Sequence, residues 1–529
     1  MVIELRRFAC RSIAVLSLVL LFIAGMAQTD DAKKAAQPGN PKPAAATEQA
    51  RPKQEPEAEL RGKTFFGHYT GRKHKPETKF NYALYIPAEY DGKTPAALLV
   101  VQDGMNPVQP AVVDRLIAEG AMPVCVIVAV SPGALDPTLP GGVRRGQRAD
   151  EYDHLGRDYP DFLIEELIPH VAKEHGLKFS DSPDMHMICG GSSGGSCAWN
   201  AAWYRNDFFH RVYLSSPSFI AFRGQEELVT LARKCETKPI RVYMTVGSSE
   251  PNQYAGNSRL VALSAESAMK YAGYDLTFED FVGGHCFGYR DFEIQQRIFR
   301  RLWQDWRTEP IKPPRFQPRI AEQIDITSKW ERTDEAMPGK PRAKTAAGTY
   351  TFQSGQIFFT ATGGAKKVVA GDFDEIAALA VSSDRWRLYI ADRARRYVFA
   401  MSINPDGTLQ SRYKLAHLHL AADCRVIGAM DLCVDTCDRV YAATELGIQG
   451  IISFGIVDSI IPLPGGLPIN ALAFGGQKGN VMYAKSGNQV FKRQWNFRGL
   501  RDDDPIIQPS TPTYNDSYTP KENTPGYVK

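Results

Sequence analysis

The stretch Met187-Ile188-Cys189-Gly190-Gly191-Ser192-Ser193-Gly194-Gly195 decides the fold of the first half of the chain. An apolar strand runs into a group of small residues, and the segment 197–204 that follows has helical spacing. A serine on a sharp turn between a strand and a helix points outward, and the helix behind it presents N–H groups toward developing negative charge. The pattern Gly-x-Ser-x-Gly at 190–194 therefore predicts a nucleophilic serine.

The glycines allow two registers for this turn. We favour Ser192, which lies closest to the end of the strand, but Ser193 also fits because Gly191 and Gly195 flank it at the same spacing. A Gly/Ser-rich turn without chemistry is the remaining interpretation.

The residues around this turn alternate short apolar runs with helical patterns. We expect strands at 96–101, 124–130, 185–189, 212–214, 240–246 and 276–282, and helices at 112–119, 159–174 and 258–272. Buried, β-branched strands that alternate with helices predict a mainly parallel sheet with helices on both faces.

A nucleophilic serine needs a base, and the base needs an orienting acid; on such a sheet they follow the serine along the chain. His285 comes directly after the last strand, behind two glycines, and is our candidate base. Glu250 follows the preceding strand and is the candidate acid. Three other carboxylates are alternatives at or inside the last strand: Asp275, Glu279 and Asp280.

Two backbone N–H groups are expected to stabilise the oxyanion. One belongs to Ser193, and the other comes from the loop after an early strand, at Gly104 or Met105.

Several motifs between 80 and 305 resemble the esterase D-like family of α/β-hydrolases, which includes enterochelin (ferric-siderophore) esterases and feruloyl esterases. They include 101–104, 148–153, 162–169, 190–195 and 283–285. The resemblance implies an α/β-hydrolase fold, Ser192 and His285 as catalytic residues, and siderophore-, feruloyl- or acetyl-ester-like substrates. It also suggests that Glu151, Tyr152 and Asp153 bind substrate, with a solvated acidic loop as the alternative. No cofactor is expected.

The second half reads as β repeats. Three segments, beginning at Ala378, Asp431 and Ala471, share an order of apolar strand, polar turn and apolar strand, and 356–370 resembles a fourth. This order is typical of propeller blades. Residues 349–500 also resemble the gluconolactonase (senescence-marker-protein) family, but they are too few for six blades of ~40–45 residues.

The gluconolactonase resemblance implies a divalent cation in a central channel. Met430 stands where that family has a carboxylate, and a methionine is not a hard oxygen ligand. We therefore expect no metal site, and a shortened propeller that binds or packs. The alternative function is a lactonase-like or noncatalytic binding protein acting through this propeller.

The remaining segments have the composition of ends and linkers. Residues 1–27 combine a basic start with an apolar run and small residues, which predicts a cleaved secretion signal and a periplasmic or extracellular protein. Residues 28–60, 307–348 and 501–529 are expected to be linkers and a flexible tail around an esterase domain at 61–306.

Composition narrows the class of function. The chain has 529 residues, 43% hydrophobic and 23% charged, with a formal charge of +4. Such a balanced charge argues against a nucleic-acid binder. We expect a small-molecule or polysaccharide-linked ester as the partner and no membrane span after signal cleavage. The oligomeric state is left open.

Overall fold

The computed structural model describes residues 61–509. The predicted signal at 1–27, the linker at 28–60 and the tail beyond residue 509 lie outside the described residues. None of the helices formed by residues 61–509 has the length and apolarity needed to cross a bilayer.

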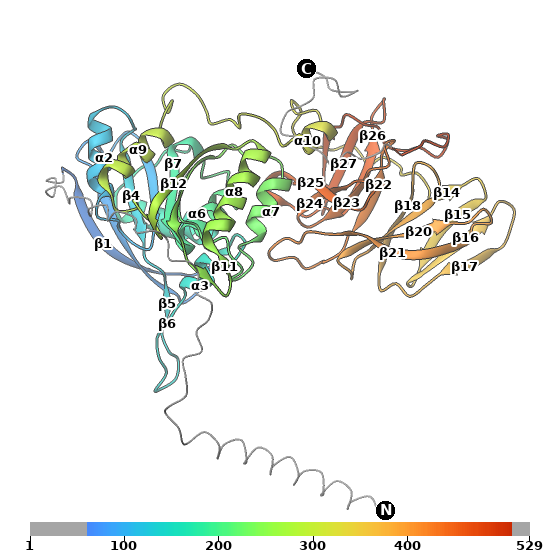
Figure 1. Cartoon of the computed structure of the whole chain (residues 1–529), viewed down its shortest axis with the longest axis horizontal. Helices are drawn as coiled ribbons and strands as arrows, with labels where there is room; N and C mark the ends of the chain where they lie inside the picture. Colours follow the sequence, from blue (N-terminus) through green and yellow to red (C-terminus); the bar gives the residue numbers. More distant parts are fainter. Residues whose placement is uncertain (1–60, 510–529) are drawn as a thin grey trace, which may run out of the picture. The chain divides into compact units, whose positions relative to one another are not determined.

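The first half is built on a mixed sheet of ten strands (Figure 1). Six neighbouring strands are parallel, and the others join antiparallel at one side. The order is β12 (Asp275–Gly284), β9 (Arg241–Ser249), β8 (Arg211–Ser215), β7 (His186–Gly191), β3 (Ala97–Gln102), β4 (Cys125–Val130), β2 (Lys79–Ile86), β5 (Ala134–Leu135) and β6 (Arg145–Gly146), with β1 (Lys63–Thr70) paired to β2.

The central strands form because their sequences are continuous apolar runs. Every residue of β3 and β4 is buried, as expected for parallel strands covered on both faces. The expected strands all form, within two residues of their predicted starts. A short hairpin, β10 (Asn252–Gln253) with β11 (Gly256–Asn257), follows β9 outside the sheet.

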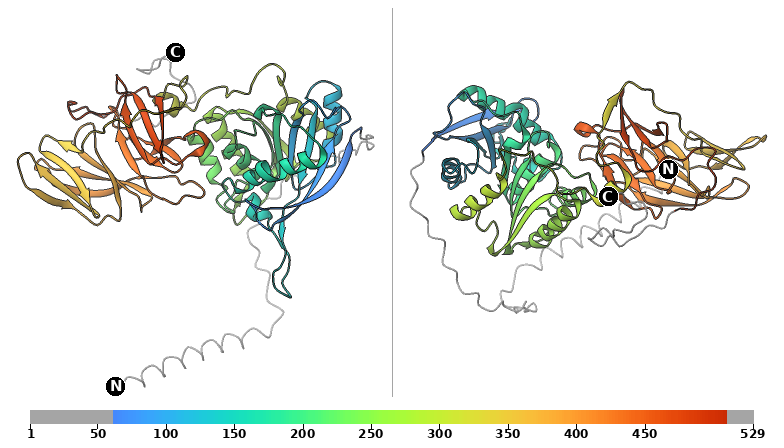
Figure 2. Two further views of the ribbon diagram at one scale, coloured as in Figure 1. Left: turned by 180° about the vertical axis from the view of Figure 1, so that it is seen from behind. Right: turned by 90° about the horizontal axis from the view of Figure 1, so that it is seen from above.

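Helices cover both faces of the sheet (Figure 2). One apolar core contains α2 and α9, and another contains α6, α7 and α8. The helices are α2 (Gln109–Ala118), α3 (Arg148–Tyr152), α4 (Asp158–Phe162), η1 (Leu163–Leu167), α5 (Ile168–His175), η2 (Pro183–Met185), α6 (Ser193–Tyr204), α7 (Glu227–Lys234), α8 (Ser258–Ala272) and α9 (Phe292–Leu302).

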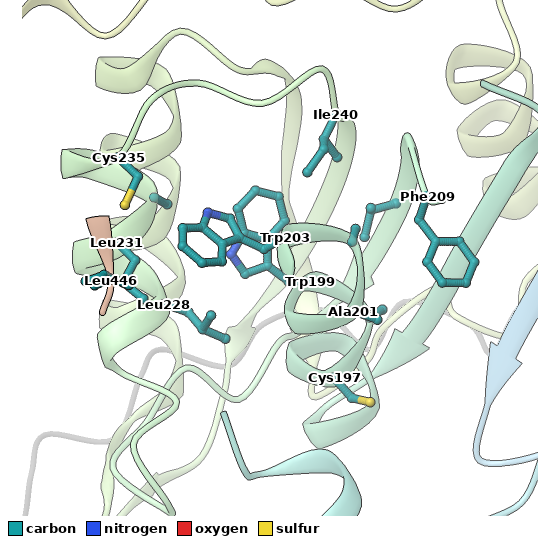
Figure 3. Packing of buried hydrophobic residues seen from close by; sticks show 14 of the residues in the cluster. Cys197, Trp199, Ala201, Trp203, Phe209, Leu228, Leu231, Cys235, Ile240 and Leu446 are labelled. Carbon is teal, nitrogen blue, oxygen red and sulfur yellow. The ribbon is translucent and has the colours of Figure 1, made fainter. Parts of the chain in front are cut away.

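Helix α6 is held firmly against its neighbours. Trp199 and Trp203 on α6 are almost completely buried, and Figure 3 shows both beside Leu228 and Leu231 of α7. The Trp199 ring also meets the edge of Tyr274, with ring centroids 5.3 Å apart. This packing fixes the N-terminus of α6, which directly follows the glycine-rich turn.

The second half consists of four antiparallel sheets of four strands each, which confirms the all-β prediction. The sheets are β14 (Lys344–Thr345) to β17 (Lys366–Ala370) with β15 (Gly348–Gln353) and β16 (Gln356–Ala361); β18 (Ile376–Val381), β19 (Arg387–Asp392), β20 (Tyr397–Ile403) and β21 (Leu409–His417); β22 (Asp431–Val434), β23 (Val440–Thr444), β24 (Gly447–Ile451) and β25 (Val457–Ile461); and β26 (Ala471–Gly475), β27 (Val481–Ser486) and β28 (Gln489–Gln494) with β13 (Glu331–Thr333). A 3-10 turn, η3 (Pro464–Gly466), precedes the last sheet. Whether the sheets form a propeller remains a prediction.

The stretch 307–348 is not the plain linker that its composition predicts. It contains α10 (Pro318–Gln323), β13 and β14, and Ile320 and Ile324 are fully buried. Strand β13 precedes the other strands of this half in sequence, yet it pairs with β28 in the last sheet. Its three residues are too few for a periodic pattern, so only the pairing reveals it.

Candidate active site

The glycine-rich turn joins β7 to α6 at Ser192. This residue has φ 57° and ψ −128°, a conformation that non-glycine residues rarely adopt. The glycines of the motif are needed sterically: a Cβ on Gly190 would lie 2.3 Å from the carbonyl oxygen of Gly194. The backbone therefore forms the sharp turn that the motif predicts.

The two candidate serines have different surroundings. The Ser192 hydroxyl lies 3.1 Å from the Ser218 hydroxyl and is partly exposed. The Ser193 hydroxyl is buried and hydrogen-bonds to Asp153. Within residues 61–509 no hydrogen bond joins Ser192 to His285.

The candidate acid and base are joined directly. Glu250 follows β9, His285 follows β12, and Nδ1 of the imidazole is hydrogen-bonded to Oε2 of the carboxylate. The Glu250 side chain is completely buried, whereas that of His285 is 32% exposed. An ionised Glu250 therefore orients the ring with Nδ1–H as donor, which leaves Nε2 as the nitrogen that can accept a proton.

The three alternative acids are ion-paired elsewhere. Asp275 binds Arg241 and Arg301, Glu279 binds Arg297, and Asp280 binds Arg259. None of these pairs includes His285.

The pKa values of the pair move apart. Burial alone would raise the pKa of Glu250, but hydrogen bonds from His285, Ser216 and the Gly247 N–H lower it below its usual value. Hydrogen bonding to the neighbouring Cys286 thiol, and then to Glu250, raises the pKa of His285 to about 10. Both shifts favour the ionic form of the pair, in which the carboxylate is ionised and the imidazole is protonated.

The glycine-rich turn at Ser192, here called the elbow, and the loop after β12 that carries His285, here called the histidine loop, meet at one carbonyl group. The Ser215 oxygen, at the end of β8, accepts from the Ser192 N–H at 2.9 Å and from the Cys286 thiol at 3.6 Å. A Cβ on Gly191 would lie 3.0 Å from the same sulfur. Residues adjacent to Ser192 and His285 are thus in contact.

One predicted oxyanion donor is already occupied. The Gly104 N–H donates to the Val130 oxygen at 3.0 Å, so Gly104 cannot serve as an oxyanion donor. The N–H groups of Met105 and Ser193 have no hydrogen-bond partner within residues 61–509. Ser193 is the first residue of α6, where N–H groups lack intrahelical acceptors.

The predicted substrate-binding residues are mostly buried. Glu151 accepts hydrogen bonds from the Gly133 N–H at 3.2 and 3.0 Å, and burial raises its pKa to about 7. The Tyr152 hydroxyl accepts from the Asp103 N–H at 3.0 Å. The Tyr152 bond braces the 103–105 loop and the Glu151 bonds hold Gly133 in the segment after β4, so we correct the prediction for these two residues. Asp153, 7% exposed, contacts Ser193 rather than open space.

Ser216 and Ser218 belong to the site but are not among the residues predicted from the sequence. Both follow β8, at the same edge of the sheet as the other site residues, and both contact them. The signal was present in the polar Ser215-Ser216-Pro217-Ser218 directly after a buried strand.

Met430 and Asp431 stand where the gluconolactonase resemblance implies a metal ligand, and their surroundings do not fit a divalent cation. The Asp431 carboxylate accepts from the Lys340 ammonium group, from the Leu432 N–H at 2.9 Å and from the Leu472 N–H at 2.8 Å. A lysine paired with the one carboxylate opposes binding of a second positive charge.

One comparison with known proteins finds a family model in the first half of the chain. Residues 74–297 match the family model described as "Putative esterase". This match confirms the predicted resemblance to an esterase family and supports a carboxylic ester hydrolase.

Solved structures are similar only in part. A ferulic acid esterase is 17% identical, with a TM-score of 0.34, over 46% of this chain and 97% of its own. The enterochelin esterase from Shigella flexneri is 20% identical, with a TM-score of 0.36, over 47% of this chain and 60% of its own. A gluconolactonase-like structure is 19% identical, with a TM-score of 0.24, over 28% of this chain and 47% of its own. No curated protein matches the sequence.

Proposed function

We propose that the chain is a secreted serine carboxylic-ester hydrolase with a Ser192–His285–Glu250 triad. The observation that carries this proposal is the hydrogen bond between Glu250 and His285. The Cys286 thiol beside His285 donates to the same Ser215 carbonyl oxygen that accepts from the Ser192 N–H. The loops after three parallel strands bring a serine, a histidine and a carboxylate to the same edge of the sheet, which supports a role in nucleophilic catalysis.

In the proposed reaction the Ser192 oxygen attacks the ester carbonyl carbon while His285 Nε2 takes the hydroxyl proton. The N–H groups of Met105 and Ser193 stabilise the tetrahedral oxyanion. The oxyanion collapses and expels the alcohol, which takes the proton from His285 and leaves an acyl-enzyme. Water then attacks the acyl group, gives its proton to His285, and the acid is released as Ser192 regains a proton.

The proposal requires one change of side-chain conformation. The Ser192 hydroxyl, here beside Ser218, must turn toward His285 before it attacks. Catalytic hydrogen bonds are often formed only with substrate bound, so a rotamer change of this kind is compatible with the mechanism. The imidazole must also be neutral, which the raised pKa of His285 favours only at alkaline pH.

The substrates that we propose are siderophore, feruloyl or acetyl esters, acted on in the periplasm or outside the cell. A fluorophosphonate probe, followed by peptide mass spectrometry, should label Ser192 of the full chain. A panel containing p-nitrophenyl acetate, methyl ferulate and a catecholate siderophore lactone would then identify the acyl group. The proposal would be contradicted if the probe did not label Ser192 and no ester of the panel were hydrolysed.

The lactonase alternative makes a different prediction. Lactone hydrolysis that is sensitive to EDTA and unchanged in Ser192→Ala would assign function to the second half instead. The contacts of Asp431 argue against metal-dependent lactone hydrolysis, because its carboxylate oxygens already bind Lys340 and two backbone N–H groups.

A further inference from the structure

Ser216 touches both loops that carry the proposed acid and base. It directly follows β8, is 2% exposed, and its own N–H donates to the Thr245 oxygen of β9 at 2.8 Å. Its φ is 44°, a conformation unfavourable for a residue with a side chain. The surrounding contacts therefore hold the backbone there against its local preference.

The Ser216 hydroxyl makes two bonds with opposite roles. It donates to Oε1 of Glu250 at 2.5 Å, and it accepts from the N–H of Cys286 at 2.9 Å. A hydroxyl has one hydrogen and two lone pairs, so both bonds form at once. One atom thus joins the acid to the residue directly after His285.

This arrangement divides the two oxygens of the carboxylate. Oε1 of Glu250 accepts from Ser216 and from the Gly247 N–H at 2.8 Å, and Oε2 is left for His285. A glutamate side chain has more rotatable bonds than an aspartate, and fixing it costs more conformational entropy. Two donors on one oxygen offset that cost and set the direction of the other oxygen.

We infer that Ser216 is a positioning residue that aligns Glu250 with the His285 imidazole by holding the acid and the histidine loop on one hydroxyl. The inference rests on the proposed triad. Ser216 touches no reacting atom, so it acts only through the orientation of its two partners.

Two variants separate the hydroxyl from the backbone. Ser216→Ala removes the hydroxyl and keeps a side chain at the unfavourable φ. Ser216→Gly also removes the hydroxyl but relieves the backbone, because glycine adopts positive φ freely. If the hydroxyl is what matters, both variants lose activity equally although glycine is the less strained.

Ser382→Ala is the matched control. The Ser382 hydroxyl is also fully buried, donates to a carboxylate (Asp384) at 2.5 Å, and accepts from backbone N–H groups of Trp386 and Arg387. It lies after β18 in the second half of the chain. Its loss removes the same kind of bonds without touching the candidate site.

The measurements use the full chain and p-nitrophenyl acetate, with active sites counted by fluorophosphonate labelling. We expect kcat to fall about 10- to 100-fold in both Ser216 variants, with KM within about two-fold of the wild type, as for loss of a hydrogen bond to a charged group. Ser382→Ala should keep wild-type kcat. Equal kcat in the wild type and both Ser216 variants, or an equal loss in Ser382→Ala, would overturn the inference.

A second readout does not depend on turnover. The Nδ1 proton between His285 and Glu250 should give a far-downfield proton NMR signal, assigned by its loss in Glu250→Gln. We expect Ser216→Ala and Ser216→Gly to shift or abolish that signal and Ser382→Ala to retain it. An unchanged signal in both Ser216 variants rejects the positioning role even if the wild type hydrolyses no ester. Absent turnover by itself refutes only the proposed function.

Discussion

Nδ1 of His285 is hydrogen-bonded to Oε2 of Glu250, although 35 residues separate them in the chain. The bond exists because β12 and β9 are parallel neighbours whose carboxyl ends lie at the same edge. The loops after these two strands therefore meet where the loop after β7 presents Ser192.

The two serines of the turn should respond differently to substitution. Ser192→Ala should lower kcat on p-nitrophenyl acetate by on the order of 10⁴-fold or more, since it removes the attacking oxygen. Ser193→Ala should keep most activity because its proposed contribution is the backbone N–H. Steady-state kinetics, with circular dichroism to verify folding, checks both variants. Loss of activity in Ser193→Ala alone would move the nucleophile to Ser193.

Replacement of a carboxylate near His285 should lower activity strongly at Glu250 and not at Glu279. Glu250→Gln keeps the shape of the side chain but removes the charge that stabilises the imidazolium, so we expect kcat to fall about 10²- to 10⁴-fold. Glu279→Gln is the control, because Glu279 lies on β12, the strand that leads to His285, but pairs with Arg297 at 2.7 Å. A large loss in Glu279→Gln with none in Glu250→Gln would reassign the acid.

The pH profile of kcat/KM should have its acid limb above the ordinary histidine pKa of 6.5. Only the neutral imidazole accepts the Ser192 proton, and the Cys286 thiol and Glu250 raise the pKa of His285 to about 10. Activity should therefore increase as pH rises through that pKa. Cys286→Ala should move the limb to lower pH, whereas Cys424→Ala, a half-buried thiol in the second half, should not. A limb at 6.5 in every variant would show that these neighbours do not shift His285.

The space around the turn should not allow a side chain in place of Gly190. A Cβ on Gly190 would overlap the backbone oxygen of Gly194, so Gly190→Ala should destabilise the fold by about 3 kcal/mol or prevent folding. Gly146→Ala is the control, because no atom lies within 4 Å of its Cβ position, and it should change stability by less than about 0.5 kcal/mol. Urea unfolding followed by tryptophan fluorescence measures both. Equal stability of the two variants would mean that the turn relaxes more than its geometry suggests.

Much of the first half could be predicted because its signals are local. The strands are continuous apolar runs, and the helix at 258–272 begins after Asn257, whose side chain caps Leu260, and ends at Gly273. The elbow is specified by glycines two residues either side of Ser192. Each of these features depends on neighbours a few residues away.

The missed features depend on partners that are distant in the chain. Ser216 bonds to the Cys286 N–H 70 residues later, and the Gly104 N–H is taken by Val130 on the neighbouring strand. Glu151 and Tyr152 look like a polar loop in the sequence, but the fold buries Tyr152 against the loop that follows β3 and Glu151 against Gly133, after β4. No local pattern records such pairings.

The sequence by itself determined which segments become strands and helices, and where a serine, a carboxylate and a histidine follow those strands. Those properties come from side-chain periodicity and the conformational freedom of glycine, which act over a few residues. Only the tertiary structure decided which N–H groups stay open, which acid reaches His285 and that Ser216 joins their loops. Strand order sets these contacts, and it results from the burial of the whole sheet rather than from any single segment.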